Sequence, residues 1–448
     1  MNRRHAPRLY RELFHIGLPI ILGQVGIILV SFIDNMMVGR YSTDALAAAS
    51  FVNNLFALVY VFGIGFAYGL TPLVTKATTL GRLQKAGMLL RHSLLLNLGL
   101  AVGVSALMLL LYAYLHLFSL SEHLLPLIRP YFLLQLGSFS IYMAYNAFKQ
   151  YFDGTGHTAV GMWLILGANL INTVGNYFLI YGKAGIPELG LTGAGIATLI
   201  TRAVALVGIY LYLVYASLFR EGLRGFLRGR YSPQTLRALV RLGLPVGMYS
   251  GVETMSFTIA LLFVTRLGII PLAVHQILCV VTTIGFFIYY GLGAATTILV
   301  SKYRTHGDML RVKAATNSGV EAALAVACLA MIIMFATRRY VAWLFTTDVE
   351  IISMTAVALI PVILYQLGDA LQVIYANALR GMEDVGYLAV VATLVHLFLE
   401  PTLSYVLGFS WGLMSPTSQL VGIWSAFPIG LLLLGILLRW RFQRITSC

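Results

Sequence analysis

Long apolar segments dominate the sequence and constrain it more than any other feature. Each segment holds about 20 or more mostly apolar residues, which is the length that a helix needs to cross a bilayer. They lie at 14–37, 46–75, 88–115, 124–150, 159–181 and 190–219, and then at 240–264, 272–300, 314–336, 351–379, 386–408 and 417–438. The sequence therefore predicts an all-α membrane protein with twelve transmembrane helices.

The composition excludes a soluble enzyme or a nucleic-acid-binding protein. Of the 448 residues, 59% are hydrophobic and only 10% are charged, whereas soluble domains carry about 25% charged residues. The net charge of +14 is carried by short basic clusters between apolar segments, not by a basic domain. The three cysteines form no motif, and two of them lie in apolar segments. No small-residue cleavage site follows the first apolar segment, so we expect this segment to be retained as a span.

The distribution of basic residues predicts the orientation in the membrane. If both termini face the cytoplasm, the basic clusters 3–11, 76–91, 220–241, 302–313 and 439–444 all lie on the cytoplasmic side. The opposite side then holds only Arg40, Arg129, Lys183, Arg266, Arg338 and Arg339. This asymmetry follows the positive-inside rule, so we predict a multi-pass protein of the cell (inner) membrane with both termini in the cytoplasm.

An internal repeat divides the chain into halves. "HIGLPIILG" at 15–23 matches "RLGLPVGMY" at 241–249, and the same offset holds without a gap to Gly81 and Gly307. Each half has six spans, so both halves enter from the same side and the repeat is parallel. We predict two six-helix bundles, at 1–219 and 239–448, joined by a cytoplasmic Arg-rich linker at 220–238, around the central cavity of a secondary transporter.

Two acidic residues inside the spans are the first candidates for a cation or proton site. Glu253 and Asp369 lie at similar depth near the membrane midplane in the second half, as judged from helical rise. Ionisable groups at this depth are costly, and two buried carboxylates need a cation or a shared proton. Tyr365 precedes Asp369 by four residues, on the same helix face. A structural pair satisfied by Ser, Thr or backbone groups is the alternative. The repeat pairs Asp369 with Ser138 and Glu253 with Ile27, so packing of a duplicated scaffold does not need these acids.

Other ionisable residues in the spans leave alternatives open. Asp34 is either a solvated interface residue or an acid that faces the first-half cavity. Glu400 either lines the second-half site or pairs with His396, four residues earlier. Arg202 is either a distant counter-ion of Glu400 or an anchor on the cytoplasmic side. Two more, Glu321 and His275, have no partner that the sequence identifies, and we interpret them as structural.

Three segments resemble the multidrug and toxic compound extrusion (MATE) family, and the resemblance extends over nearly the whole chain. They are "FIDNMMVGR" (32–40), "NYFLIYGKAGIPELG" with "GAGIATLITR" (176–202), and "YQLGDALQVIYANALRGMED" (365–384). The sequence looks closest to the NorM-like branch. The resemblance implies the MATE/MOP fold and a multidrug efflux antiporter, which exports amphipathic, mostly cationic organic compounds in exchange for Na⁺ or H⁺.

The resemblance also implies roles for single residues. In the NorM-type pattern a Glu in span seven and an Asp and a Tyr in span ten bind the coupling cation, and Glu253, Asp369 and Tyr365 occupy those positions. No metal site is implied beyond Na⁺ at the two acids.

In the first half, Asp34 matches the acid of span one that is implicated in coupling and drug binding. Asn172 and Asn176 match an Asn pair that lines the first-half cavity. The DinF-type branch usually has Asp in place of Asn176, which argues against that branch. Glu400 is not part of the core pattern of the family, although we include it among the candidate proton or substrate residues.

The sequence argues against two other functions. A lipid-linked saccharide flippase of the same superfamily would be expected to line its cavity with Arg and Lys, whereas the charges within the spans are mainly acidic here. A membrane enzyme would need a nucleophile–base or metal motif, and HExxH, GxSxG and Cys/His ligand spacings are absent from the sequence. We therefore predict a monomeric transporter without a cofactor, whose partners are small organic cations, the coupling ion and the lipid bilayer, with no nucleic acid.

Overall fold

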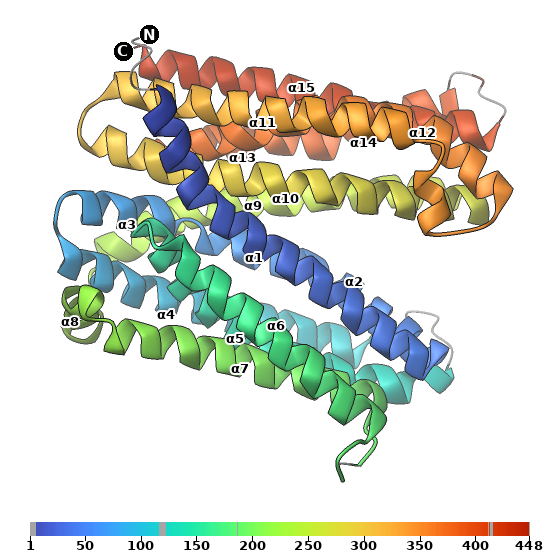
Figure 1. Ribbon diagram of the computed structural model, residues 1–448, viewed down its shortest axis with the longest axis horizontal. Coiled ribbons are helices and arrows are strands. Elements are labelled where there is room, and N and C mark those ends of the chain that lie inside the picture. The colour runs from blue at the N-terminus through green and yellow to red at the C-terminus, as the bar shows by residue number, and fades with distance from the viewer. Residues whose placement is uncertain (1–5, 116–121, 186, 411, 413–414, 448) are drawn as a thin grey trace. The chain divides into compact units, whose positions relative to one another are not determined.

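The computed structural model describes residues 6–115, 122–185, 187–410, 412 and 415–447. These residues form helices joined by short turns and contain no β-strand (Figure 1). The α-helices are α1 (Ala6–Tyr41), α2 (Thr43–Ala67), α3 (Leu70–Thr79), α4 (Leu83–Ala113), α5 (Leu125–Gly154), α6 (Thr158–Tyr181), α7 (Gly190–Tyr215), α8 (Arg220–Arg228), α9 (Pro233–Thr265), α10 (Ile269–Thr305), α11 (Met309–Thr337), α12 (Val349–Gly381), α13 (Val385–Thr393), α14 (Glu400–Tyr405) and α15 (Pro416–Thr446). Short 3₁₀ turns lie at Glu122–Leu124, Ser217–Phe219 and Val341–Leu344, and π-helical turns at Leu394–Leu399 and Val406–Ser410.

Each predicted span falls on one helix or on a continuous run of helices. Within the described residues, eleven helical segments are long and apolar enough to cross a membrane. The predicted span at 124–150 coincides with α5, which is not one of the eleven. Helix α5 carries Gln135, Asn146, Lys149 and Gln150, and most of its central and C-terminal residues are buried. Its polarity is explained by its position inside the protein, where other helices cover it.

Two compact units emerge from the contacts along the chain. The N-unit comprises Leu22–Gly247, and the C-unit comprises Met1–Ile21 together with Met248–Cys448. These boundaries differ from those of the predicted bundles, because α1 and α9 each contribute residues to both units. The last residues before the two boundaries, Ile21 and Gly247, are equivalent positions of the internal repeat. The two units therefore exchange equivalent segments, as expected if the repeat is structural.

The N-unit is organised around α5, which packs against α2, α3, α4, α6 and α7. Helix α8, in the predicted Arg-rich linker, packs against α4 of the same unit. The C-unit is organised around α12, which packs against α10, α11 and α15. Helices α5 and α12 are equivalent in the repeat, so each unit places the same helix at its centre.

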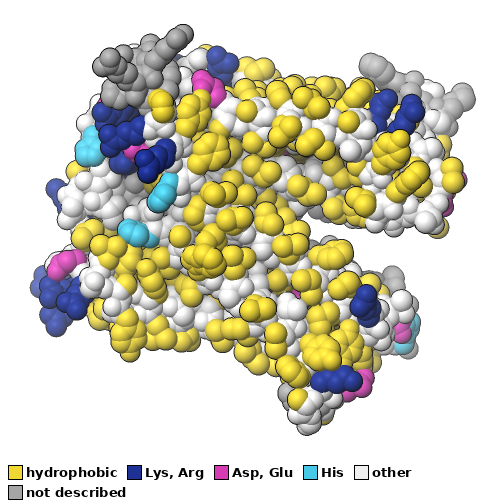
Figure 2. Space-filling view, viewed as in Figure 1, with side chains coloured by type: hydrophobic (Ala, Val, Ile, Leu, Met, Phe, Trp, Pro, Cys, Tyr) yellow, Lys and Arg dark blue, Asp and Glu magenta, His cyan; other side chains and the backbone are white. Residues whose placement is uncertain are grey.

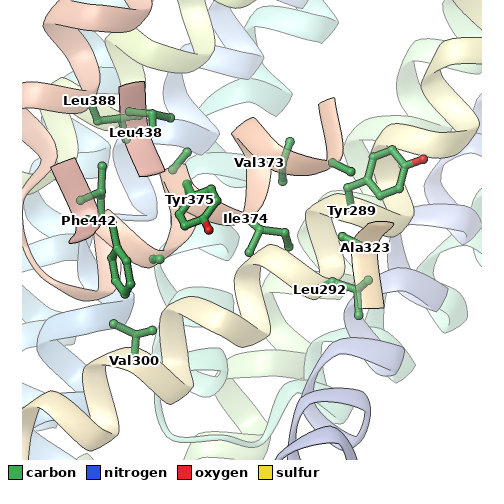
Figure 3. Close-up of a cluster of buried hydrophobic side chains, with 14 of the residues drawn as sticks. Tyr289, Leu292, Val300, Ala323, Val373, Ile374, Tyr375, Leu388, Leu438 and Phe442 are labelled. Carbon is green, nitrogen blue, oxygen red and sulfur yellow. The ribbon is translucent and has the colours of Figure 1, made fainter. Parts of the chain in front are cut away.

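Figure 3 shows part of the apolar core of the C-unit. Tyr289 and Leu292 of α10 lie near Val373 and Ile374 of α12, and Ala323 of α11 completes this part of the cluster. Lipid tails are as apolar as these side chains, so the cluster stabilises the unit through close van der Waals packing rather than by removing apolar surface from water.

The outer surface agrees with a membrane environment. Figure 2 shows hydrophobic side chains along the flanks of the helices and Lys and Arg side chains gathered near their ends. Many large apolar side chains are exposed in both units, among them Trp163, Leu170, Leu262 and Ile332. Such a surface suits the hydrocarbon of a bilayer, where exposed apolar groups carry no cost.

The helical run that begins with α13 changes its winding twice. The π-helical turn Leu394–Leu399 precedes α14, and a second one, Val406–Ser410, follows it. Pro401, the second residue of α14, lacks an N–H and its ring clashes with the carbonyl four residues earlier, so it cannot continue a regular α-helix. π-helical turns are frequent at functional sites, and Glu400, the residue that follows the first turn, is buried in the C-unit.

Helices α4 and α8 approach so closely that a glycine is required between them, which gives a stability prediction. A Cβ at Gly87 would lie 1.8 Å from the carbonyl oxygen of Gly222, whereas a Cβ at Gly99, on the same helix, would meet no atom within 4 Å. We expect Gly87→Ala to destabilise the protein by about 1–3 kcal/mol through overpacking, measured as thermal unfolding in detergent. Gly99→Ala is the matched control, because both changes add the same methyl group to α4. Equal melting temperatures of the two variants would contradict this account of the contact.

Candidate functional site

The two predicted acids of the second half meet at one glutamine side chain. Gln372 Nε2 donates to Glu253 Oε1 at 2.9 Å and to Asp369 Oδ1 at 3.2 Å. The two carboxylate oxygens are thus within two hydrogen-bond lengths of each other, and α9 supplies one and α12 the other. The Tyr249 hydroxyl of α9 donates to the side-chain Oε1 atom of Gln372 and so fixes the orientation of its amide. Asp369 and Gln372 are fully buried, and Glu253 is half-buried.

A third carboxylate, Glu400, is buried in the same unit. Its Oε2 atom accepts a hydrogen bond from Ser256 Oγ at 2.6 Å and lies 2.9 Å from His396 Nδ1. The predicted pairing of Glu400 with His396 is therefore present, one helical turn apart, in the π-helical region. Gly430 of α15 allows this approach, because a Cβ there would lie 2.5 Å from Glu400 Oε1. We call Glu253, Asp369, Gln372, His396 and Glu400 the acid cluster.

The acid cluster is not saturated by protein donors. Asp369 Oδ2, Glu400 Oε1 and His396 Nε2 are buried and have no hydrogen-bond partner within the described part of the chain. The donor that Glu253 and Asp369 share is the side-chain amide of Gln372 rather than a Ser, Thr or backbone group. Carboxylate oxygens buried without donors are costly unless a cation or proton joins them. The cluster can therefore hold a cation such as Na⁺, or protons.

Tyr365 lies one turn before Asp369 on α12 and is buried. Its ring packs against Phe257, with the centroids 6.4 Å apart. No hydrogen bond joins it to the acids among the described residues. Phe257 in turn stacks on Phe427 of α15, at 4.7 Å between centroids. Phe257 thus belongs to an aromatic cluster of the C-unit.

Glu321 and His275, for which the sequence identified no partner, each contact another side chain in the structure. Tyr10 donates to Glu321, and Glu321 is otherwise exposed on α11. Trp424 Nε1 donates to His275 Nδ1 at 3.1 Å, and Cys279 Sγ lies 3.5 Å from His275 Nε2. These contacts support their interpretation as structural residues and supply the partners that the sequence did not identify.

A cavity of about 200 Å³ lies in the N-unit and brings together polar and aromatic side chains of five helices. Its lining consists of Ile27, Val30, Ser31, Asp34, Tyr60, Tyr142, Tyr145, Ile165, Ala168, Asn169, Asn172, Thr198, Thr201, Arg202 and Ala205. Tyr142 and Tyr145 of α5 supply two of its aromatic side chains. We call this space the N-unit cavity.

Two amides hold Asp34 at the N-unit cavity. Asn176 Nδ2 donates to Asp34 Oδ1 and lies 3.3 Å from Asn172 Oδ1. With its amide turned by half a rotation, Asn172 donates to Asp34 Oδ1 at 2.8 Å and to Oδ2 at 3.2 Å. Asp34, Asn172 and Asn176 thus form one constellation, and of the two interpretations of Asp34 the structure favours the acid that faces a cavity.

Arg202 reaches the same cavity from α7. Its guanidinium donates to the Tyr60 hydroxyl and, at 2.6 Å, to Ser138 Oγ. It also lies over the rings of Tyr60 and Tyr142, at 4.7 and 5.0 Å from their centroids. Neither interpretation offered for Arg202 describes this position, because its contacts are with hydroxyl groups and aromatic rings inside the N-unit rather than with Glu400 or a membrane surface.

Three residues that contact the acids of the C-unit were not identified from the sequence. Gln372 lies three positions after Asp369, on the same helix face, and this spacing could have identified it. Tyr249 and Ser256 flank Glu253 along α9 and carried no signal, because Tyr and Ser are common in membrane helices. Within the described residues, no three His, Cys, Asp or Glu side chains converge as they would around a transition metal.

Comparisons with known proteins place the chain in a family. The sequence model of the MatE family matches residues 19–178 and 245–422, which is well over half of the chain. The chain belongs to the MatE family. Its two matched segments correspond to the two repeats. Proteins of this family are transporters, so the MatE protein is a transporter and not an enzyme.

Solved structures with the same fold include transporters from distant sources. A MOP superfamily transporter from Pyrococcus furiosus is 18% identical, with a TM-score of 0.87 over 98% of this chain and 96% of its own. An outward-facing multidrug resistance MATE family transporter is also 18% identical, with a TM-score of 0.88 over 98% of this chain and 96% of its own. The eukaryotic MATE transporter AtDTX14 is 17% identical, with a TM-score of 0.86 and 98% coverage of both chains. The predicted fold is confirmed, and the NorM-like branch stays a prediction.

The Gln372 bridge gives a prediction that stability measurements can check. Gln372→Met keeps the size of the side chain but removes the donor shared by Glu253 and Asp369. We expect a loss of about 1–3 kcal/mol, the cost of a buried acceptor left without its donor, and a larger loss at alkaline than at acidic pH, because protonation relieves the repulsion between the acids.

Thermal unfolding in detergent across pH measures this effect. The matched control is Gln443→Met on the exposed face of α15. A Gln372→Met variant that is as stable as the control at every pH would show that the bridge does not hold the acids.

Proposed function

We propose that this MatE protein is a secondary active multidrug efflux antiporter of the inner membrane. It exports amphipathic, mostly cationic organic compounds and takes up Na⁺ or H⁺ in exchange, by alternating access. Both termini face the cytoplasm, as the basic clusters predict. The coupling ion binds at Glu253 and Asp369, and the organic compound binds at the N-unit cavity.

The observation that carries this proposal is the shared amide between Glu253 and Asp369. A single uncharged donor brings two carboxylates together but supplies no positive charge. Glu400 adds a third carboxylate to the unit, and His396 Nδ1 is its nearest titratable partner. The buried Asp369 Oδ2 atom has no hydrogen-bond partner within the described part of the chain, so it is the atom to which a cation or proton would bind.

Exchange follows from competition between two positive species. A cation or proton bound at the acid cluster removes the repulsion between Glu253 and Asp369 and stabilises one conformer of the protein. An organic cation that binds the other conformer weakens binding of the coupling ion, and by thermodynamic linkage the coupling ion weakens binding of the organic cation by the same factor. The parallel repeat supplies the two similar halves that alternating access uses in other transporters.

The flippase of the same superfamily is the alternative, and the charges of the cavity weigh against it. A pyrophosphate lipid would need several basic side chains, whereas the N-unit cavity is lined by one Arg and one Asp. The acid cluster has no role in binding an anionic lipid. These charges support the antiporter.

Removal of either acid tests the proposed coupling site. We expect Glu253→Gln and Asp369→Asn each to abolish efflux of a fluorescent organic cation, because neither variant retains two carboxylates for the coupling ion. Glu321→Gln is the control, since Glu321 is an exposed acid of the same unit that contacts Tyr10. Normal efflux by both acid variants, inserted at wild-type levels, would remove these residues from the mechanism.

The identity of the coupling ion is decided by imposing gradients one at a time. We expect proteoliposomes to accumulate or release the fluorescent cation under either a Na⁺ gradient or a pH gradient, and the Glu253→Gln variant to respond to neither. Transport that is unaffected by both gradients would contradict antiport.

A further inference from the structure

The N-unit cavity contains a positive charge that the antiport mechanism does not use. The Arg202 guanidinium lies over the rings of Tyr60 and Tyr142, 4.7 and 5.0 Å from their centroids, and the two rings contact each other edge to face at 5.4 Å. Its hydrogen bonds go to the Tyr60 and Ser138 hydroxyl groups. An arginine remains charged at any physiological pH, so this charge is a permanent part of the cavity.

This position affects which ligand the cavity can take. Aromatic rings in a transporter cavity attract organic cations through cation–π contact. Here Arg202 already makes this contact with both Tyr60 and Tyr142. A second cation placed there would also be repelled by the guanidinium. The positive group of a bound compound is therefore expected at Asp34 rather than at these two rings.

The charge of Arg202 is not neutralised by an ion pair. The ion pairs among the described residues do not include Arg202. Asp34 lines the same cavity but is held by Asn176. Hydroxyl groups and rings carry no net negative charge, so the guanidinium retains its affinity for a carboxylate, which it can bind through two parallel hydrogen bonds.

Further polar groups in the lining lack partners. Asn169 Nδ2 and Thr201 Oγ1 are buried and have no hydrogen-bond partner within the described part of the chain, and both residues line the N-unit cavity. An amide N–H and a hydroxyl can donate to an anionic oxygen. Together with Arg202 they give the cavity an excess of donors, while Asp34 supplies the one negative charge of the lining.

We propose that the N-unit cavity binds the acidic group of its cargo through Arg202. The protein then favours aromatic zwitterions over analogues in which the acidic group is esterified and carries no charge. Asp34 receives the positive group of the same compound. The cavity volume of about 200 Å³ is below the roughly 300–1,000 Å³ of pockets for whole drug-sized ligands, so it fits the ionic end of such a compound. This inference rests on the proposed function only in assuming that the ligand of the cavity is the exported compound.

The experiment compares two dyes that differ in one group. Rhodamine 110 carries a free carboxylate, and rhodamine 123 is its methyl ester. Binding of each to the purified full chain in detergent is measured by fluorescence polarisation. We expect the wild type to prefer the acid, and Arg202→Gln to weaken binding of the acid by about tenfold or more, the loss of a charge-assisted hydrogen bond. The ester should bind the variant at least as tightly, because the rings of Tyr60 and Tyr142 become available.

Controls separate recognition from folding. Arg202→Lys keeps the charge without the planar fork and should retain part of the preference for the acid. Arg237→Gln removes an exposed arginine of the same unit and should leave both affinities unchanged. A wild type without preference for the acid, an undiminished affinity of Arg202→Gln for it, or an equal loss for both dyes would overturn the proposal.

The binding assay needs no ion gradient, so its outcome is independent of the proposed antiport. An Arg202-dependent preference for the acid, in a protein that does not export either dye under a Na⁺ or pH gradient, would support this inference and contradict the proposed function. Export of the ester driven by an ion gradient, with no effect of Arg202→Gln on the binding of either dye, would support the proposed function and contradict this inference.

Discussion

One amide group shared by two buried carboxylates is the interaction on which this account depends. Gln372 donates to Glu253 and to Asp369 and so joins α9 to the central helix α12. Two carboxylates at this separation repel each other in a low-dielectric environment, and a neutral amide does not remove their charge. The stability of the C-unit is therefore tied to whether a positive ion or proton is bound there. This link between charge and stability is what a coupled transporter needs.

The internal repeat makes the difference between the units informative. Asp369 is equivalent to Ser138, and in the N-unit Ser138 accepts a hydrogen bond from Arg202. The same position of the scaffold thus carries an acid that forms no ion pair among the described residues in one unit, and a hydroxyl bound to a guanidinium in the other. A duplicated scaffold can keep its packing while the two copies acquire opposite charge. In our proposal, this divergence assigns the coupling ion to the C-unit and the cargo to the N-unit.

Much of the fold could be predicted from the sequence, because long apolar segments have few alternatives in a bilayer. The repeat and the proximity of Glu253 and Asp369 followed from spacing and depth. The partners could not be predicted, since hydrogen bonds between helices depend on the rotation of each helix, which apolar sequence leaves undetermined. Arg202 illustrates this limit: its span was correct, but its aromatic surroundings come from Tyr60 and Tyr142, far away in the chain. Glu400 is similar, because the π-helical turns that turn it inward have no clear sequence signal beyond Pro401.

The most direct test of the central claim is to count the positive ions released when cargo binds. Purified protein in weakly buffered detergent solution is titrated with a fluorescent organic compound that it binds, while proton release is followed with a pH indicator and Na⁺ release with an ion-selective electrode. The account predicts release of protons or Na⁺ upon binding, and no release from a Glu253→Gln, Asp369→Asn double variant that still binds the compound. Binding without release in the wild type, or equal release in the double variant, would contradict it.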